Sequence, residues 1–313
     1  MASPRILSLL PSATEIAVAV GRGEGLVGRS HECDFPPFVE ALPVCTGTKL
    51  EKGLTSRQIE DRVQEIVRQG LSVYEVNAAL VRALKPDVVL TQSQCAVCAV
   101  TPADLEEALA DWVGTPPTLL SLAPDNLDDV WGDLRRVGEA VGAPDEAAAA
   151  ILRLQDGLQA IRVRSAARGW RPRVATIEWI EPLMTAGNWV PELIDAAGGE
   201  ALLASPGQHS PWIEWEALAA ADPDVIVLMP CGYRIGQILA EMPSLHARPG
   251  WRDLRAVKAG RVFAVDGHYY FSRPSPRLLE SAEILAEILD RCVDERSAVA
   301  GPMGERWRVA AVG

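Results

Sequence analysis

The chain has 313 residues, of which 48% are hydrophobic, and this excludes a disordered protein while allowing one large domain or two of ordinary size. Its net charge of −12 argues against partners that select basic surfaces, namely nucleic acid and anionic membranes. No stretch of about 18 apolar residues lacks a charge, so we expect no insertion into a membrane.

Strands and helices are predicted to alternate along the first part of the chain, with proline and glycine at their boundaries. Ser12 or Thr14 can cap the first helix, and Gly21 ends it. The strands expected here are Arg5–Leu10, Leu26–Arg29, Val88–Gln92 and Thr118–Leu122. The helices expected here are Glu15–Val20, Ser56–Gly70, Val73–Leu84 and Pro102–Val113.

A long stretch of helical character, Leu127–Arg168, comes next. Its alanine-rich part, Asp145–Arg168, contains no proline, and at 1.5 Å per residue such a helix reaches about 30 Å or more. This length suits a helix that connects two lobes. An ordinary surface helix of one lobe is the alternative.

The last part of the chain returns to the same alternation. The strands expected here are Arg173–Trp179, Val225–Met229 and Arg261–Val265. The helices expected here are Pro191–Ala197, Trp215–Ala221 and Arg277–Arg291. The segment after Asp294 is predicted to be a peripheral tail.

One pattern occurs twice, as LVRALKPDVVLTQ at residues 80–92 and as LAAADPDVIVLMP at residues 218–230. In each copy an apolar helix ends before a proline, an aspartate follows, and a β-branched run begins. The run is apolar on both faces, as a buried parallel strand requires. The repeat therefore predicts two similar α/β lobes, and a cleft between two lobes suggests a ligand.

Ligands of parallel α/β sheets bind beyond the carboxyl ends of the strands, and four of the six cysteines fall in such loops. Two of them have the CxxC spacing of metal or redox sites, and His31 or His268 could add a ligand. The candidate metal or iron–sulfur ligands are Cys33, Cys95, Cys98 and Cys231. The alternatives are small apolar thiols that pack the loops and a thioredoxin-like redox motif.

Tryptophans are unevenly distributed, and seven of the nine follow residue 169. Trp179 flanks one predicted loop and Trp212 lies in another, and aromatic side chains at loops offer the large flat apolar area that suits a large flat ligand. Packing in the core is the alternative. The chain contains none of the nucleophile, dinucleotide-binding, P-loop or zinc-protease motifs, so we expect a binding protein and not an enzyme.

The opening RILSLLPSATEIAVAVG with LVGRSHECDFPP resembles the start of the vitamin B12-binding proteins of ABC importers, which are class III periplasmic-type binding proteins. The resemblance continues through LKPDVVLTQ, MTAGNWVPELIDAAGGE, PWIEWEALAAADPDVIVL and YYFSRPSPRLLESAEIL, in the expected order. It implies an α/β fold of two Rossmann-like lobes with parallel sheets, joined by a single long linker helix. The expected division is 1–125, N-terminal lobe; 126–170, linker helix region; 171–293, C-terminal lobe; and 294–313, tail.

The resemblance also implies non-catalytic binding of cobalamin or a related corrinoid in the cleft, with an ABC transporter permease as a possible partner. A siderophore or haem binder on the same fold is an alternative. The residues that the resemblance implies as ligand contacts are Pro11, Ser12, Ala13, Glu32, Gln94, Cys95, Trp212, Tyr270, Phe271 and Arg273. Trp179 joins them as an aromatic candidate at the end of the predicted strand Arg173–Trp179.

Two features depart from the exported B12 binders. The start of the chain has neither the basic nor the long apolar region of a signal peptide, and its loops are rich in cysteine. We therefore expect a cytoplasmic protein from the sequence as it stands, and a periplasmic or extracytoplasmic one if an export signal has been removed. An intracellular protein that binds metal or an iron–sulfur cluster through the four cysteines remains an alternative.

Overall fold

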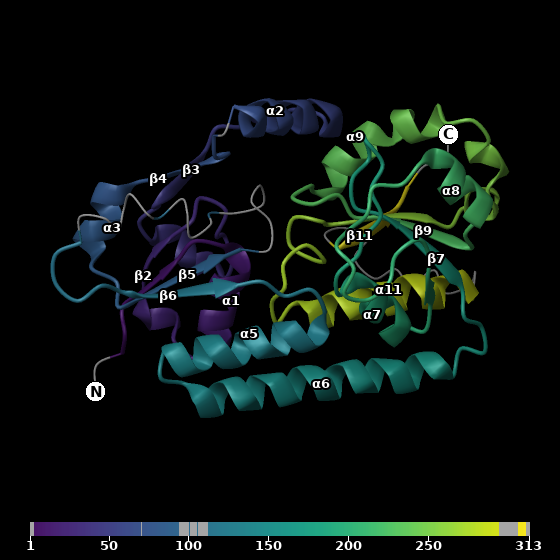
Figure 1. The fold of residues 1–313 in the computed structure, drawn as a ribbon. Coiled ribbons are helices and arrows are strands. Elements are labelled where there is room, and N and C mark those ends of the chain that lie inside the picture. The colour runs from purple at the N-terminus through teal and green to yellow at the C-terminus, as the bar shows by residue number, and fades with distance from the viewer. Residues whose placement is uncertain are drawn as a thin grey trace. The chain divides into compact units, whose positions relative to one another are not determined.

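The computed structural model describes residues 3–69, 71–93, 100, 105, 112–293 and 306–310. The chain divides into two units, each with its own parallel sheet (Figure 1). Unit 1 comprises residues 1–54 and 58–153, and unit 2 comprises residues 55–57 and 154–313. No helix in the described ranges is both long and apolar enough to cross a membrane.

Unit 1 contains a parallel sheet in the order β2-β1-β5-β6 and a separate antiparallel pair, β3 with β4. Helix α1 packs against α5, while α3 contacts β2. The strands are β1 (Ile6–Ser8), β2 (Leu26–Arg29), β3 (Thr46–Thr48), β4 (Tyr74–Val76), β5 (Val88–Gln92) and β6 (Thr118–Leu122). The helices are α1 (Pro11–Ala19), α2 (Ser56–Arg68, whose first two residues are grouped with unit 2), α3 (Ala78–Leu84) and α5 (Leu127–Ala140).

Unit 2 contains a sheet in the order β11-β10-β9-β7-β8, parallel throughout except for the antiparallel edge strand β11. Figure 1 shows α7 and α11 on one face of this sheet and α8 and α9 on the other. The strands are β7 (Arg173–Ile177), β8 (Glu200–Ala201), β9 (Val225–Leu228), β10 (Val262–Val265) and β11 (Trp307–Val309). The helices are α7 (Val190–Ala196), α8 (Trp215–Ala221), α9 (Ile235–His246), α10 (Arg255–Lys258) and α11 (Leu278–Val293).

The division falls inside one long helix, α6 (Pro144–Ala166), between Arg153 and Leu154. The sequence predicts one helical stretch over 127–168, but α5 and α6 are separate, with a left-handed turn at Gly142 (φ 68°) between them. Helix α6 has 23 residues, so it is roughly 35 Å long. Residues 306–310, expected to be a peripheral tail, instead supply the edge strand β11.

The repeated sequence pattern forms the same local structure in both units. Helices α3 and α8 each end on a left-handed residue, Lys85 (φ 45°) and Asp222 (φ 40°). The strands that follow, β5 and β9, are buried along their whole length between parallel neighbours. This confirms the prediction of two buried strands and two similar α/β units.

The aspartate of each repeat fixes the start of the neighbouring strand. Asp87 accepts a hydrogen bond from the backbone N–H of Arg5 at 2.8 Å, and Asp224 accepts the equivalent bond from Arg173 at 2.9 Å. The backbone N–H of each aspartate also donates a hydrogen bond to the carbonyl of the same arginine, at 2.8 Å for Asp87 and 2.9 Å for Asp224. The aspartate of each Pro-Asp pair therefore sets the register of its strand, β5 against β1 and β9 against β7.

Replacing Asp224 by alanine is expected to destabilise unit 2 by about 1 to 3 kcal/mol. The substitution removes the acceptor of the Arg173 N–H and the ion pair with Arg255, whose Nη1 lies 2.8 Å from Oδ1. Urea unfolding with a probe in unit 2 measures the change. Asp253→Ala, at an aspartate whose side chain is 84% exposed, is the matched control. Equal stability of the two variants would contradict the assigned role.

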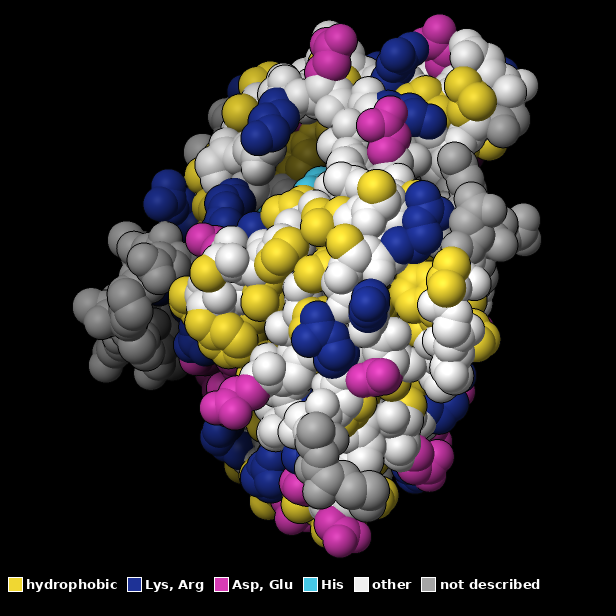
Figure 2. Space-filling model, turned by 90° about the vertical axis from the view of Figure 1, so that its left-hand side faces the viewer, with side chains coloured by type: hydrophobic (Ala, Val, Ile, Leu, Met, Phe, Trp, Pro, Cys, Tyr) yellow, Lys and Arg dark blue, Asp and Glu magenta, His cyan; other side chains and the backbone are white. Residues whose placement is uncertain are grey.

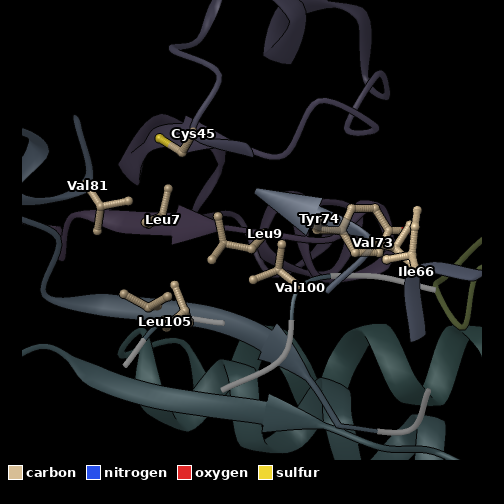
Figure 3. Close-up of a cluster of buried hydrophobic side chains, with 10 residues drawn as sticks. Leu7, Leu9, Cys45, Ile66, Val73, Tyr74, Val81, Val100 and Leu105 are labelled. Carbon is tan, nitrogen blue, oxygen red and sulfur yellow. The ribbon is translucent and has the colours of Figure 1, made fainter. Parts of the chain in front are cut away.

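Unit 1 has a core built around the β1 segment (Figure 3). Leu7 and Leu9 project from this segment, and the ring of Tyr74 from β4 and the side chain of Val81 from α3 pack around them. Burial raises the pKa of the Cys45 thiol in this cluster to about 11, so it stays protonated and packs as a small apolar side chain. The remaining members of the cluster are Ile66, Val73, Val89, Val100 and Leu105.

Two helix boundaries differ from the prediction. Helix α1 begins at Pro11 and not at Glu15, because a proline at the first helical position already has the φ angle that a helix needs. The predicted helix Val73–Leu84 is strand β4 followed by α3, with Asn77 as N-cap accepting the N–H of Leu80 at 3.0 Å. Pairing with β3 decides the conformation of this segment, and a local pattern does not reveal a partner strand.

The surface of unit 1 carries charges of both signs. Figure 2 shows basic and acidic side chains of the described residues scattered among hydrophobic ones on one face. Single exposed apolar residues such as Phe38 (51%) and Leu71 (51%) are ordinary on a protein surface.

Asp133 on α5 is expected to make unit 1 less stable as the pH rises from 4 to 7. Burial raises the pKa of this carboxyl from 3.8 to about 6, against the opposing effect of Arg136. The unfolded chain releases the proton at lower pH, so the stabilisation is complete below about pH 4 and is lost as the pH rises through 6. Asp133→Asn should remove this dependence, which amounts to roughly 2 to 3 kcal/mol.

Urea unfolding of wild type and Asp133→Asn at several pH values measures the difference. Asp128→Asn, on the exposed side of the same helix, is the control. Parallel stability curves for wild type and Asp133→Asn would contradict the prediction.

Candidate functional site

The strands of unit 2 direct three loops to one edge of the sheet. Strands β7, β9 and β10 are parallel, so their carboxyl ends lie together. The loops that follow are residues 178–189, 229–234 and 266–277. Aromatic side chains come from all three, which places Trp179, Tyr233 and Tyr270 at this edge.

Trp212 is held in a defined position although its side chain is largely outside the core. Met184 forms a bridge on one side to Trp179 and on the other to Trp212. The N–H of Ile213 also donates to the carbonyl of Leu183 at 3.0 Å. Trp212 is nevertheless 53% exposed. A large indole that is fixed by its backbone and open to solvent is suited to contact a flat apolar ligand.

Trp179 packs beside this segment. Its ring centroid lies 5.5 Å from that of Tyr233, and the rings are tilted by 60°. The hydroxyl of Tyr233 donates to Oε1 of Glu241 at 3.0 Å, which fixes the second ring. The indole nitrogen of Trp179 is buried and has no hydrogen-bond partner among the described residues. The loops after β7 and β9 therefore present a connected aromatic surface.

A buried carboxyl supports the loop after β7. Glu178 accepts a hydrogen bond from the hydroxyl of Ser210, which in turn accepts the N–H of Gly187 at 3.0 Å. Burial raises the pKa of Glu178, against smaller lowering effects of Ser210 and His209. An alanine Cβ at Gly187 would lie 2.2 Å from the carbonyl oxygen of Gln208, so only glycine fits. This network links the Trp179 segment to the Trp212 segment.

The loop after β10 mixes buried and accessible residues. Asp266 is buried, and its Oδ1 accepts the N–H groups of His268 at 3.0 Å and of Tyr269 at 2.9 Å. Tyr270 is half-buried, whereas Phe271 is 1% exposed and its carbonyl accepts the indole N–H of Trp189 at 2.7 Å. Phe271 therefore packs in the interior and supports the loop, and its side chain is not open to a ligand.

In unit 1, the residues after β1 are mostly buried. Pro11 is partly exposed, but the side chains of Ser12 and Ala13 are only 3% and 0% exposed because α1 begins here and turns them into the unit. The predicted contacts of Ser12 and Ala13 with a ligand would therefore have to be made by their backbone atoms. Glu32, after β2, is partly exposed, and its N–H donates to the hydroxyl of Ser30 at 3.3 Å.

His31 belongs to a hydroxyl network in unit 1. Its Nδ1 lies 2.8 Å from the hydroxyl oxygen of Thr46, which also donates to Ser30 at 3.1 Å. Burial and the neighbouring Arg29 lower the pKa of His31. The ring of Tyr74 lies 5.8 Å away, centroid to centroid. The histidine is therefore a hydrogen-bonded side chain within this loop.

Two of the four predicted metal ligands, Cys33 and Cys231, lie within the described residues. Cys33 is fully buried and its sulfur accepts a hydrogen bond from the hydroxyl of Thr14 at 3.1 Å, while Cys231 is exposed. Gln94, Cys95 and Cys98 lie outside the described residues. Within the described ranges, no group of three or more His, Cys, Asp or Glu side chains is placed to hold a metal ion.

The sequence analysis did not identify the residues that hold Trp179 and Trp212 in place. Met184, Tyr233 and Ser210 carry no recognisable motif, although each follows a strand or flanks a tryptophan in the sequence. Their positions in the loops after β7, β8 and β9 are the signal that could have identified them, because every strand-end loop is a candidate.

Comparisons with known proteins bear on this arrangement. The family model described as periplasmic binding protein matches residues 6–269. An uncharacterized ABC transporter substrate-binding lipoprotein of Bacillus subtilis, YvrC, is 25% identical over 290 residues, covering 90% of this chain and 79% of its own. A vitamin B12-binding protein of Yersinia pestis is 25% identical over 289 residues, covering 91% and 86%.

Solved structures share the fold. The periplasmic vitamin B12-binding protein BtuF of Vibrio cholerae aligns with a TM-score of 0.64 and 22% identity, covering 93% of this chain and 98% of its own. A periplasmic haem-binding protein from Pseudomonas aeruginosa aligns with a TM-score of 0.68 and 22% identity, covering 99% and 100%. At these identities the likeness concerns the architecture.

Proposed function

The chain belongs to the periplasmic binding protein family, and on this premise we propose that it is the substrate-binding component of an ABC-type uptake system with a corrinoid such as cobalamin as its ligand. The names of its relatives in Bacillus subtilis and Yersinia pestis support transport and the corrinoid. Because these relatives are named as binding proteins, they also support binding without catalysis.

The observation that carries the proposal is the fixed and exposed Trp212, which is linked through Met184 to Trp179. The ring of Trp179 in turn lies against that of Tyr233. A corrinoid is a wide, flat macrocycle with a largely apolar face. An indole that is already ordered loses little conformational entropy when such a face stacks on it. Pro11 and Glu32 in unit 1, and Tyr270 and Arg273 in unit 2, are proposed as further contacts.

The proposed role places the protein outside the cytoplasm, where a permease of the uptake system would be its partner. The description of the Bacillus subtilis relative as a lipoprotein supports this location in place of the cytoplasmic one expected from the sequence. The buried thiols are compatible with either compartment, because burial raises the pKa of Cys45 and Cys292 to about 11 and makes both unreactive.

A second candidate ligand is an acidic tetrapyrrole such as haem. It is favoured by the basic surroundings of Tyr269, where the guanidinium carbon of Arg234 lies 4.4 Å from the ring centroid. A siderophore with ionised oxygen donors would meet the same surroundings.

Visible absorption titration of the purified protein tests the function. Cobalamin, cobinamide and iron protoporphyrin IX are added separately, after the metal content of the protein as isolated has been measured. Saturable binding of cobalamin in the micromolar range or tighter is the expected result. Preferential binding of iron protoporphyrin would replace the corrinoid by haem, and no spectral change with any of the three would overturn the proposal.

A further inference from the structure

One histidine of unit 1, in the loop after β2, has a ring nitrogen that is open to solvent. Nδ1 of His31 is hydrogen-bonded, but none of the described residues forms a hydrogen bond with Nε2, and this atom is not sealed in the interior. The side chain as a whole is partly exposed. Strands β1 and β2 are parallel, so the loop lies at the carboxyl edge of the sheet, where ligands of such sheets bind.

The hydrogen bonds around Nδ1 fix which ring nitrogen carries the proton. Nδ1 of His31 lies 2.8 Å from the hydroxyl oxygen of Thr46. The single hydrogen of that hydroxyl is donated to Ser30 at 3.1 Å, so Nδ1 is the donor in its contact with Thr46. Partial burial and the charge of Arg29 lower the pKa of this ring and favour its neutral form. A neutral imidazole that donates through Nδ1 has its lone pair on Nε2, so the open nitrogen is the one that can bind a metal.

The loop holds the imidazole in place. The backbone N–H of His31 donates to the hydroxyl of Thr46 at 3.0 Å, so one side chain fixes both the backbone and the ring. Arg29 donates to the carbonyls of Ser30 at 3.1 Å and Cys33 at 3.0 Å, on the two sides of the histidine. An ordered ring loses little conformational entropy when it binds a metal, and the hydrogen bond from its other nitrogen makes it a stronger ligand.

We propose that Nε2 of His31 is an axial ligand of the metal at the centre of the bound macrocycle. This inference rests on the proposed function and narrows its ligand to forms with an exchangeable axial position. In aquacobalamin the imidazole displaces the water opposite the nucleotide base. The cobalt–oxygen bond breaks, a cobalt–nitrogen bond forms, water leaves, and the cobalt keeps its oxidation state. Cyanocobalamin holds cyanide at this position and offers no such exchange.

Absorption titrations with aquacobalamin and cyanocobalamin test the axial bond. Exchange of water for imidazole shifts the visible bands of aquacobalamin, whereas cyanocobalamin binds with its axial ligands unchanged. The proteins compared are wild type, His31→Gln and the matched control His246→Gln, whose histidine is in α9 of unit 2. Thr46→Val removes the hydroxyl that accepts from Nδ1, and Thr46→Ser restores a hydroxyl at this position.

We expect wild type to bind aquacobalamin about tenfold or more tightly than cyanocobalamin and to shift its bands. His31→Gln should lose the shift and bind both forms equally, while His246→Gln behaves as wild type does. Thr46→Val should weaken aquacobalamin alone, by about tenfold, and Thr46→Ser should recover most of the loss. Unchanged binding of cyanocobalamin by the variants shows that they are folded.

Binding of both corrinoids by wild type without a band shift, unchanged in His31→Gln, would overturn the axial ligand and leave the proposed function intact. If iron protoporphyrin IX binds in place of the corrinoids, the same variants decide. Loss of an imidazole-bound iron spectrum in His31→Gln would support the axial ligand, and an unchanged spectrum would overturn it. Binding of none of the three compounds would overturn the proposed function, and the axial ligand with it.

Discussion

Gly267→Ala is expected to lower the thermal midpoint of the protein by roughly 6 °C or more and to abolish ligand binding. A Cβ at this position would lie 2.2 Å from the carbonyl oxygen of Pro230 and 3.0 Å from that of Met229. The N–H of Gly232 donates to the carbonyl of Gly267 at 3.2 Å, so the loops after β9 and β10 touch here backbone to backbone. Separating the two loops costs about 3 kcal/mol and moves Tyr270 away from Tyr233 in the loop after β9.

Differential scanning calorimetry and the absorption titration measure the two effects. Gly236→Ala is the matched control, because a Cβ there meets nothing within 4 Å and the position lies in α9, where alanine is the better helix former. This control should keep or slightly raise the midpoint. A Gly267→Ala protein with wild-type stability and affinity would show that the close contact of the two loops is unimportant.

Trp212→Ala is expected to weaken binding of the corrinoid by about 10- to 100-fold without changing stability. The substitution removes the exposed indole but leaves its backbone position next to Met184 intact. Losing one stacked aromatic contact at the centre of a binding surface costs about 1.4 to 2.8 kcal/mol. Trp212→Phe keeps a flat ring at the site and should retain most of the affinity.

The measurement is the cobalamin titration with all variants at one salt concentration. Leu152→Ala on α6 is the control for the removal of an exposed apolar side chain, since Leu152 is 60% exposed. If Trp212→Ala binds cobalamin as tightly as wild type does, the aromatic surface of unit 2 is not the ligand contact.

Much of the fold could be predicted because its signals are local. Pro86-Asp87 and Pro223-Asp224 each mark a helix end and a buried strand, and both strands are present as β5 and β9. Strands of this kind are apolar on both faces, which a single stretch of sequence displays. The β3–β4 pair was not predicted, because Tyr74–Val76 is a strand only through its pairing with Thr46–Thr48.

The candidate site could be predicted only in outline. The rule that ligands bind beyond strand ends selects the segments around Trp179, Trp212 and Tyr270, and all three lie in strand-end or neighbouring loops. The rule does not reveal which side chains of a loop are exposed to solvent. Phe271 lies next to Tyr270 in the sequence, yet its side chain is only 1% exposed. The same limit applies to Ser12, which the early start of α1 buries.

By itself, the sequence determined the two similar α/β units and the loops that end their strands, because helix ends, turns and buried strands depend on neighbouring residues. Only the tertiary structure decided which side chains meet. In the sequence, 42 residues lie between Arg234 and Arg277, yet both side chains contact the ring of Tyr269. Parallel strands bring distant loops to one edge, and that proximity depends on the pairing of β9 with β10.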